Sequence, residues 1–364
     1  MPKHRIAWLP GDGVGPEVLE AARMVLDATG LRAEYLHGDI GWDFWRSEGD
    51  PLPARTLDLL KKTDCAFLGA VTSKPDPEAM RELAPALRKK GLTYRSAVLR
   101  IRQLFDLYIC LRPCRAYPGN PGNSMEGIDI DIFRENTEGL YVGVEWWRVP
   151  DGLRRFPGME RIPESAAVSI RAVTPRASRR IAMAAFEHAR RRGRKRVTAV
   201  HKANVLRATC GTFLEAVREV AAEFPGIEYE EMHIDACAAR MVRDPLHFEV
   251  VVTTNLFGDI LSDLCAQLVG GLGFAPSASI GDSYALFEPT HGSAPDIAGK
   301  GIANPAAAIL AAGLMLDWLG ERKRAEALEG AVAEVIREGK VRTPDAGGSA
   351  RTMEFAAAVA EKIE

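Results

Sequence analysis

Short apolar runs alternate with amphipathic helical patterns along most of the chain, and this alternation limits its fold more than any other feature. Buried strands are predicted at RIAWL, CAFLGAV and FEVVVTTN, and KRVTAVHKANV begins as a further strand. Apolar residues three and four positions apart predict helices at residues 16–30, 178–193, 209–226, 304–320 and 324–339. Strands that alternate with helices pair mostly in parallel, because each helix returns the chain to the same edge of the sheet. The sequence therefore predicts an α/β protein with a largely parallel sheet.

The length and charge of the chain bear on its partners. Its 364 residues suffice for one large or two modest domains, and its formal net charge of −2 gives no general attraction to nucleic acid or acidic membranes. The N-terminal apolar run is too short for a secretory signal, and the longest apolar stretch, residues 305–316, is shorter than the roughly 18 residues that suggest a membrane span. Six scattered cysteines without C-x-x-C pairs are predicted to be reduced core residues. We expect a soluble, cytoplasmic protein that binds neither nucleic acid nor membranes.

A basic run, HARRRGRKRV, begins at His188. It fits the end of the helix at residues 178–193, with cations in the last turn and Gly193 as the cap. A nucleic-acid site would need more than one such helix terminus.

Two aspartates in a mostly apolar segment suggest a bound cation. Asp259 and Asp263 follow a predicted buried strand, in a helical pattern whose buried face is predicted to contain Ile260, Leu261, Leu264 and Leu268. Residues four apart are neighbours on a helix, so like charges there repel by about 0.2–0.5 kcal/mol in water, and burial adds to that cost. No lysine or arginine lies between Arg243 and Lys300 to compensate the pair locally. A cation from outside this segment is therefore expected.

The segment PGDGVGPEV follows a predicted strand and opens a helix. Its glycines, Gly11, Gly13 and Gly15, have the spacing G-x-G-x-G rather than the G-x-G-x-x-G of dinucleotide-binding folds. A tight glycine turn before a helix explains the motif at least as well as a cofactor site.

Several cationic side chains fit a small acid with more than one carboxylate as the ligand. Arginine binds carboxylates through two parallel hydrogen bonds, and the chain has arginines at 100, 102, 112, 115 and 134. Lys202 follows a buried strand, where partial desolvation lowers a lysine pKa and allows acid or base chemistry. Asp235 is a third acidic residue beside apolar neighbours. Taken singly, each arginine or lysine is better explained as an exposed charge or a surface ion pair, so the prediction depends on their convergence.

Six motifs in order resemble the β-decarboxylating dehydrogenase family. They are GDGVGPEV, DLYICLRP, FRENTEGLY, HKANV, NLFGDILSD and FEPTHGSAPDIAGKGIANP, and they extend from about Pro10 to Asn304. The family includes isocitrate, homoisocitrate, 3-isopropylmalate and tartrate/malate dehydrogenases. The resemblance implies an isocitrate/isopropylmalate dehydrogenase-like fold, with two α/β domains flanking an active-site cleft. One domain would comprise residues 1–107 and 270–364, and the other residues 108–269.

The resemblance also implies the roles of the site residues. Mg²⁺ or Mn²⁺ would be bound by Asp259 and Asp263, with Asp235 donated by a second subunit, and would polarise the C2 hydroxyl of a 2-hydroxy-3-carboxy acid. Lys202 of that second subunit would take the hydroxyl proton as hydride passes to the nicotinamide, and Tyr141 would protonate C3 after loss of CO₂. The residues implied to bind the substrate are Ser96, Arg102, Arg112, Arg134 and Asn204. Such sharing requires a homodimer, or a tetramer built from it.

The cofactor implied is NAD. Its site matches Thr72, Glu288, His291, Gly292, Ser293, Ala294, Asp296, Ile297 and Asn304. A carboxylate at Asp296 can accept hydrogen bonds from the adenosine ribose but would repel a 2′-phosphate. NADP-dependent relatives tend to have lysine and tyrosine at the positions of Asp296 and Ile297.

The segment YRSAVLRIR lies where members of the family differ in the group that they accept at C3. Ser96 matches a serine of isocitrate enzymes, Val98 and Leu99 match leucines of isopropylmalate enzymes, and homoisocitrate enzymes often have an arginine at the position of Leu99. Arg95 and Arg100 make the segment polar, and an isopropyl group would leave a buried hydroxyl and a cation unpaired, at a cost of about 1–3 kcal/mol. The predicted order of substrates is isocitrate, homoisocitrate, 3-isopropylmalate, and then tartrate or D-malate.

Two other classes of function are compatible with the aspartates alone. A metal-dependent phosphatase or hydrolase would need a nucleophile and no nicotinamide. A non-catalytic organic-acid-binding or RNA-binding role would be favoured if neither metal nor NAD bound. A panel of acids with NAD and Mg²⁺, followed at 340 nm, separates these possibilities.

Overall fold

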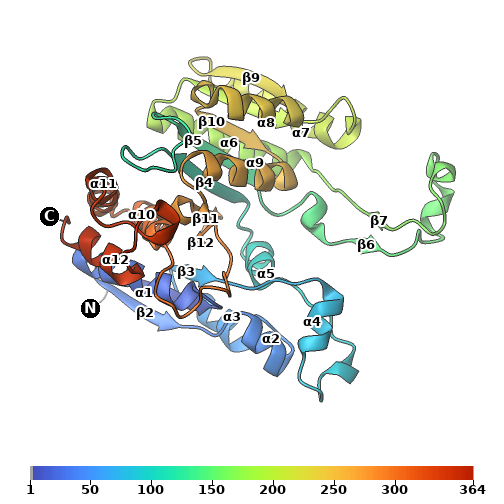
Figure 1. Cartoon of the computed structure of the whole chain (residues 1–364). Helices are drawn as coiled ribbons and strands as arrows, with labels where there is room; N and C mark the ends of the chain where they lie inside the picture. The colour runs from blue at the N-terminus through green and yellow to red at the C-terminus, as the bar shows by residue number, and fades with distance from the viewer. Residues whose placement is uncertain (1–2, 364) are drawn as a thin grey trace.

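The computed structural model describes residues 3–363, and one ten-stranded sheet runs through the molecule (Figure 1). The strand order is β2-β1-β3-β12-β11-β4-β5-β10-β8-β9. The strands are β1 His4–Gly11, β2 Ala33–His37, β3 Cys65–Ala70, β4 Ile109–Arg115, β5 Asp129–Glu135, β8 Arg196–His201, β9 Glu228–His233, β10 Val250–Thr253, β11 Pro276–Ile280 and β12 Ala285–Pro289.

The sheet is mixed. Six of its neighbouring strand pairs are parallel, as the strand–helix alternation predicts. Three pairs in the middle, β12–β11, β11–β4 and β4–β5, are antiparallel. The prediction of a largely parallel α/β sheet is thus confirmed, with an antiparallel centre that the pattern did not indicate. The two predicted domains stay a prediction; β11 and β4, one from each, are neighbours in this single sheet.

Helices cover both faces of the sheet, because successive strand residues point to opposite sides. Ile6 and Trp8 of β1 pack into one core cluster, whereas Ala7 and Leu9 pack into another. The helices are α1 Gly15–Ala28, α2 Trp42–Glu48, α3 Ala54–Leu60, α4 Asp76–Glu82, α5 Ala97–Leu104, α6 Pro175–Arg192, α7 Arg207–Ala222, α8 Ile234–Arg243, α9 Asn255–Leu268, α10 Ala306–Trp318, α11 Arg322–Glu338 and α12 Thr352–Ala360.

The helices predicted from periodicity are all present, as α1, α6, α7, α10 and α11. The basic run is confirmed as a helix end, since α6 terminates at Gly193 with a left-handed φ of 68°. All six cysteines are buried and free. Helix α9 also forms as predicted, but Ile260 is 56% exposed, so its assignment to the buried face was wrong.

The glycine-rich segment at the end of β1 lies against two other parts of the chain, one at Ala70 and one at Ser293. Gly11 and Gly13 have φ angles of 72° and 59°, which favour glycine. A Cβ would lie 1.8 Å from the Ala70 carbonyl oxygen at Gly11 and 1.9 Å from the Ser293 carbonyl oxygen at Gly13. The tight-turn interpretation of this motif is therefore confirmed, and close backbone approach explains its glycines.

An arm, defined here as residues 139–173, extends away from the sheet (Figure 1). It contains the short antiparallel pair β6 Glu145–Trp146 and β7 Val168–Ser169. Trp147 is 86% exposed and Phe156 is 61% exposed on it. Within residues 3–363, no helix combines the length and apolar character that crossing a bilayer requires.

Candidate active site

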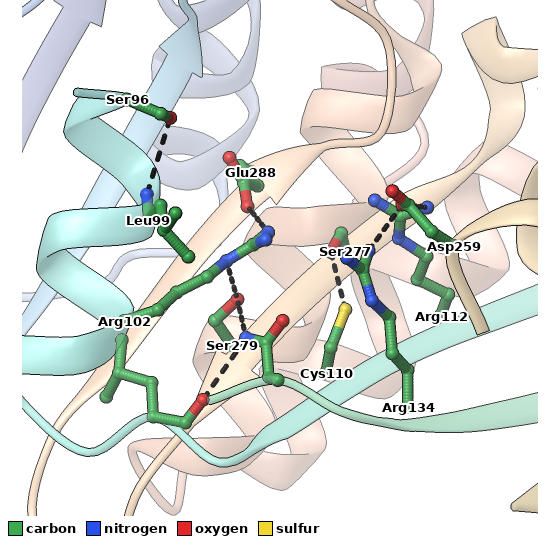
Figure 2. A network of polar contacts seen from close by, with 12 residues as sticks. Ser96, Leu99, Arg102, Cys110, Arg112, Arg134, Asp259, Ser277, Ser279 and Glu288 are labelled. Carbon is green, nitrogen blue, oxygen red and sulfur yellow. Dashed lines mark hydrogen bonds and ion pairs between the residues drawn. The ribbon is translucent and has the colours of Figure 1, made fainter. Parts of the chain in front are cut away.

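Two arginines from adjacent strands point at helix α9 (Figure 2). Arg112 on β4 and Arg134 on β5 are both buried, and Arg134 is only 1% exposed. Gly258 makes this approach possible, because a Cβ there would lie 2.6 Å from the Cβ and Cγ of Arg134. A glycine within a helix costs about 1 kcal/mol relative to alanine, so close packing of the arginine against the helix explains its position.

The aspartates of α9 meet these arginines. Nη1 of Arg112 lies 3.0 Å from Oδ1 of Asp263 and 3.4 Å from Oδ1 of Asp259, and it donates to Oγ of Ser262 at 2.7 Å. Nη1 of Arg134 also donates to Oδ1 of Asp259. The cations that the local sequence lacks therefore come from strands more than a hundred residues away in the chain.

The two carboxylates have different electrostatic environments. Burial raises the pKa of Asp259, but the charge of Arg134, a hydrogen bond from Tyr141 and the charge of Arg112 together bring it below its usual value. Burial, with the charge of Asp259 adding to it, holds the pKa of Asp263 above its usual value against the charge of Arg112. Asp259 is thus firmly a counter-ion of buried arginines, whereas Asp263 is under-compensated.

The under-compensated carboxylate fits a divalent metal ion. Carboxylate oxygens are the ligands that Mg²⁺ and Mn²⁺ prefer, and the side chains of Asp259 and Asp263 are 32% and 54% exposed. Within residues 3–363, no three His, Cys, Asp or Glu side chains lie close enough together to hold a metal. The aspartate pair would therefore need further ligands from the substrate, from water or from another subunit.

Tyr141, which matches the predicted general acid, lies at the same place. Its hydroxyl donates to Oδ2 of Asp259, and the guanidinium carbon of Arg134 lies 5.0 Å from the centre of its ring. Burial, with the hydrogen bond to Asp259, raises the pKa of Tyr141. The phenol is therefore held protonated, as a general acid must be.

Helix α5 brings the third arginine to the site (Figure 2). Nη2 of Arg102 donates to Oε1 of Glu288 at 2.8 Å, and its Nε donates to Oγ of Ser279 at 3.1 Å. Ser96, Leu99 and Arg102 are three residues apart and lie along one side of the helix. Glu288, predicted to contact the cofactor, is paired with Arg102 in this structure.

The same helix corrects two expectations about substrate selection. Arg100 is not an unpaired cation, because its Nη1 donates to Asp50. Val98 is 8% exposed and packs in the core, so little of its side chain is left to contact a substrate. Oγ of Ser96 accepts the Leu99 N–H at 3.4 Å as the N-cap of α5, which leaves its own hydroxyl hydrogen free to donate.

Lys202 and Asp235 form a separate pair. Nζ of Lys202, just after β8, lies 2.5 Å from Oδ1 of Asp235 at the start of α8. The charge-assisted hydrogen bond from Lys202 lowers the pKa of Asp235. Asn204 is exposed nearby in the sequence, and within residues 3–363 no hydrogen bond or ion pair joins these three residues to the arginine and aspartate cluster. The chain therefore brings together Arg102, Arg112, Arg134, Tyr141, Asp259 and Asp263, but not Lys202, Asp235 and Asn204.

The predicted cofactor residues lie on the loop after β12 and beside it. Oγ of Ser293 lies 2.7 Å from Oγ1 of Thr72, and Nδ2 of Asn304 donates to Asp345 at 3.0 Å. Ala294 has a left-handed φ of 38°, Ile297 is partly buried against the core, and Asp296 is exposed. Nε2 of His291 is buried without a hydrogen-bond partner, and a Cβ at Gly292 would meet open space. An orphan buried nitrogen beside open space fits a bound polar ligand such as a nicotinamide dinucleotide.

Three residues that hold the arginines in place were not predicted from the sequence. Asn255 accepts from Nε and Nη2 of Arg134 at 2.9 and 2.6 Å, Ser262 accepts from Arg112, and Ser279 accepts from Arg102. Asn255 and Ser262 share a helical face with the two aspartates at spacings of four and three, so the helical pattern contained the signal for them. The position of Ser279 on a neighbouring strand left no such signal.

Comparison with known proteins shows that the chain is similar to one family of dehydrogenases. The family model described as isocitrate/isopropylmalate dehydrogenase matches residues 5–359. The chain is 45% identical over 361 residues to an isocitrate/homoisocitrate dehydrogenase of Thermus thermophilus, covering 99% of both chains. It is 44% identical over 360 residues to a 3-isopropylmalate dehydrogenase of Archaeoglobus fulgidus, again covering 99% of both. The crystal structure of an isocitrate dehydrogenase from Methylococcus capsulatus superposes with a TM-score of 0.88, at 42% identity and 99% coverage of both chains.

Proposed function

The chain belongs to the isocitrate/isopropylmalate dehydrogenase family, and we propose that it catalyses the NAD-dependent oxidative decarboxylation of a 2-hydroxy-3-carboxy acid, with isocitrate as the preferred substrate. As a member of this family the protein is an enzyme, an oxidoreductase whose relatives generally use a nicotinamide cofactor and a divalent metal. The relatives named above differ in their substrates, so the choice among acids rests on the site itself.

The observation that carries the proposal is the convergence of three buried arginines, a phenol and an aspartate pair. Arg102, Arg112 and Arg134 supply donors for the carboxylates at C1 and C3, because a guanidinium can bind each carboxylate through two hydrogen bonds. In this structure the same donors are held by Glu288, Asp259 and Asp263. The arginines are therefore oriented before any substrate arrives, which reduces the entropy lost on binding.

The side chains of the chain can move the required protons. Lys202 in its neutral form, with Asp235 and a water molecule as the relay, would take the proton of the C2 hydroxyl, and NAD would be the hydride acceptor. Asp259 and Asp263 would hold Mg²⁺ or Mn²⁺, which would supply the Lewis acidity that favours loss of CO₂ from the keto acid. The Tyr141 hydroxyl then delivers its proton to C3, and its raised pKa keeps it protonated until that step.

The start of helix α5 favours a substrate with a third carboxylate. Ser96 keeps a free hydroxyl hydrogen, and the first N–H groups of a helix have no acceptor within it. Such a terminus stabilises a nearby negative charge. Arg100 is already paired with Asp50, so the Ser96 hydroxyl and the helix terminus take its place as the groups that would bind the third carboxylate. The proposed order of preference is therefore isocitrate, homoisocitrate, 3-isopropylmalate, and then tartrate or D-malate.

We expect Ser96→Ala to lower kcat/KM for isocitrate about tenfold, the effect of losing one hydrogen bond to a charged group. D-Malate, which has no group at C3 beyond its carboxylate, should lose little. The loss of the helix cap affects every substrate equally, so the ratio of the two kcat/KM values isolates recognition of the third carboxylate. If 3-isopropylmalate is the best substrate and Ser96→Ala does not change the ratio, the assignment to isocitrate is wrong.

The proposed cofactor specificity depends on Asp296. Its side chain is exposed, so its repulsion of a 2′-phosphate is weaker than between buried charges, and we expect a preference for NAD over NADP of at least about tenfold in kcat/KM. Replacing Asp296 with Lys and Ile297 with Tyr should shift the preference towards NADP. The measurement is kcat/KM for both cofactors at low and high salt, since screening should narrow the difference. Equal values for the unaltered enzyme would contradict the assignment.

We further propose a homodimer in which each active site takes Lys202 and Asp235 from the partner. The separation of this pair from the aspartates of α9 within one chain supports the sharing. Exposed apolar side chains near α8 and α9 support the contact surface: Val205, Val242, Leu246 and Ile260 are 65%, 60%, 53% and 56% exposed. A contact between two copies of the chain would remove the apolar surface of these residues from water, which favours the dimer. The buried free cysteines fit the reducing conditions of a cytoplasmic location.

A further inference from the structure

One carboxylate in the glycine-rich segment has a set of contacts that neither the catalytic chemistry nor the turn explains. Oδ1 of Asp12 accepts the Trp42 N–H at 2.7 Å, and Oδ2 accepts the same N–H at 2.9 Å and the Thr72 N–H at 2.8 Å. The backbone of Asp12 is itself fixed, since its N–H donates to the Ala70 carbonyl at 2.8 Å. Asp12 therefore joins the ends of β1 and β3 to the start of α2.

The contacts continue from Thr72 to the predicted cofactor loop. Oγ1 of Thr72 lies 2.7 Å from Oγ of Ser293, and the Thr72 carbonyl accepts from the Tyr94 hydroxyl at 3.0 Å. The Ser293 carbonyl in turn accepts the Val14 N–H at 2.9 Å, two residues beyond Asp12. These bonds form a closed ring through Asp12, Thr72, Ser293 and Val14.

A negative charge at this position is not favourable for folding. Burial raises the pKa of the Asp12 carboxyl above its usual value, although hydrogen bonds from the Thr72 and Trp42 backbone oppose that rise. A carboxyl group whose pKa is raised by folding lowers stability progressively as the pH rises above its unfolded pKa, and this loss is complete above its folded pKa, where the group is charged. The ring therefore suggests a role for Asp12 other than stability.

The loop at the end of the ring has the features of a polar ligand site. Ser293 is 7% exposed, and it lies between the buried, unpartnered Nε2 of His291 and the strained backbone of Ala294. Residues held in an uncommon backbone conformation persist only when their surroundings fix them. The hydrogen bond between the hydroxyls of Thr72 and Ser293 helps to hold this backbone in place.

We propose that Asp12 is a positioning residue for the cofactor loop: by holding the Thr72 amide it fixes the Thr72 hydroxyl against Ser293, and so pre-organises residues 291–294 to bind NAD. The inference rests on the proposed function, because it assumes that this loop binds the dinucleotide. It assigns Asp12 no contact with the cofactor or the substrate.

Asp12→Asn tests this with minimal change of shape. Asparagine has one acceptor oxygen. If this oxygen takes the place of Oδ1, the Thr72 N–H loses its acceptor; if it takes the place of Oδ2, the NH₂ group faces the Trp42 N–H across the 2.7 Å that a hydrogen bond now spans, and this repulsion displaces the oxygen that holds Thr72. Either change weakens the hold on the Thr72 amide and should raise the Kd for NADH about tenfold, measured by fluorescence titration without substrate. The KM for isocitrate with Mg²⁺ and the kcat at saturating NAD should stay within about twofold, because the site around Asp259 does not touch Asp12.

Asp64→Asn is the matched control. Oδ2 of Asp64 also accepts a backbone N–H in the same part of the sheet, that of Arg5 at 2.7 Å, but it has no link to the cofactor loop. This variant should keep the Kd for NADH of the unaltered enzyme. Hydrogen exchange provides a second readout: the amide of Thr72 should exchange faster in Asp12→Asn and unchanged in Asp64→Asn.

Thr72→Val tests the second half of the ring and remains informative if Asp12→Asn does not fold. It keeps the amide that Asp12 holds and removes the hydroxyl that faces Ser293, so it should raise the Kd for NADH with no faster exchange at residue 72. The double variant should bind NADH no more weakly than whichever single variant binds it less tightly, because both substitutions interrupt the same series of hydrogen bonds from Asp12 through Thr72 to Ser293.

An unchanged Kd for NADH in Asp12→Asn or in Thr72→Val overturns the inference alone. An unaltered enzyme that neither binds NADH nor oxidises any acid with NAD overturns the proposed function and the inference with it.

Discussion

Replacing Asp263 with Asn is expected to lower kcat/KM for isocitrate about 1000-fold, because Lewis-acid stabilisation contributes several kcal/mol and each 1.4 kcal/mol is a factor of ten. The fold should not suffer. Asp263 is half exposed and lies beside a like charge, and its partner Arg112 is also held by Ser262 and Asp259. The free energy of unfolding without metal should therefore be unchanged or slightly higher than in the unaltered chain.

The effect of Mg²⁺ on the Tm distinguishes the loss of a metal ligand from a general loss of folding stability. Mg²⁺ should raise the Tm of the unaltered enzyme, since a ligand that binds only the folded state stabilises it, and should not raise the Tm of Asp263→Asn. Asp58→Asn, which changes an exposed carboxylate paired with Lys61, is the control and should respond like the unaltered enzyme. Turnover that survives EDTA and Asp263→Asn would contradict a metal-dependent mechanism.

Asp259 does not allow an equally clean test. It is the counter-ion of Arg134, a fully buried cation, so Asp259→Asn would leave a charge that costs several kcal/mol when unpaired. The free energy of unfolding should therefore be retained in Asp263→Asn but reduced in Asp259→Asn. A loss of activity in Asp259→Asn would combine metal binding with unfolding.

Two inactive variants are expected to restore activity when they form one dimer. Lys202→Met and Asp263→Asn should each be inactive alone. If each site takes Lys202 from one subunit and Asp263 from the other, a mixed dimer contains one intact site and one with both substitutions. Random pairing makes half of the dimers mixed, so co-expression should yield about a quarter of the activity of the unaltered enzyme.

The same experiment distinguishes sharing from a site within one chain. In the latter case each subunit of a mixed dimer keeps its own defect, and co-expression would restore nothing. Val242→Glu in both chains provides the control, because a charge among the exposed apolar residues near α8 and α9 should dissociate the dimer and abolish the restored activity. Sedimentation measures the dissociation directly.

The sequence by itself determined the elements and the identity of the reactive groups. Apolar periodicity is a property of one strand or helix, so it located α6 with its Gly193 cap and α9 with its aspartates. The six motifs likewise depended on residues adjacent in the chain, and the comparisons confirm the family that they indicated. The assignments of individual cofactor and metal ligands, and the two domains, stay predictions.

Only the tertiary structure decided which charges meet. Arg134 reaches Asp259 because β5 pairs with β10, and β10 leads directly into α9; Arg112 reaches Asp263 because β4 pairs with β5. The order of the strands in the sheet brings these side chains together, and the residue pattern of a single strand or helix does not reveal that order. For the same reason the pairing of Arg100 with Asp50 and the exposure of Ile260 could not be predicted, since each depends on what packs against the helix rather than on the helix itself.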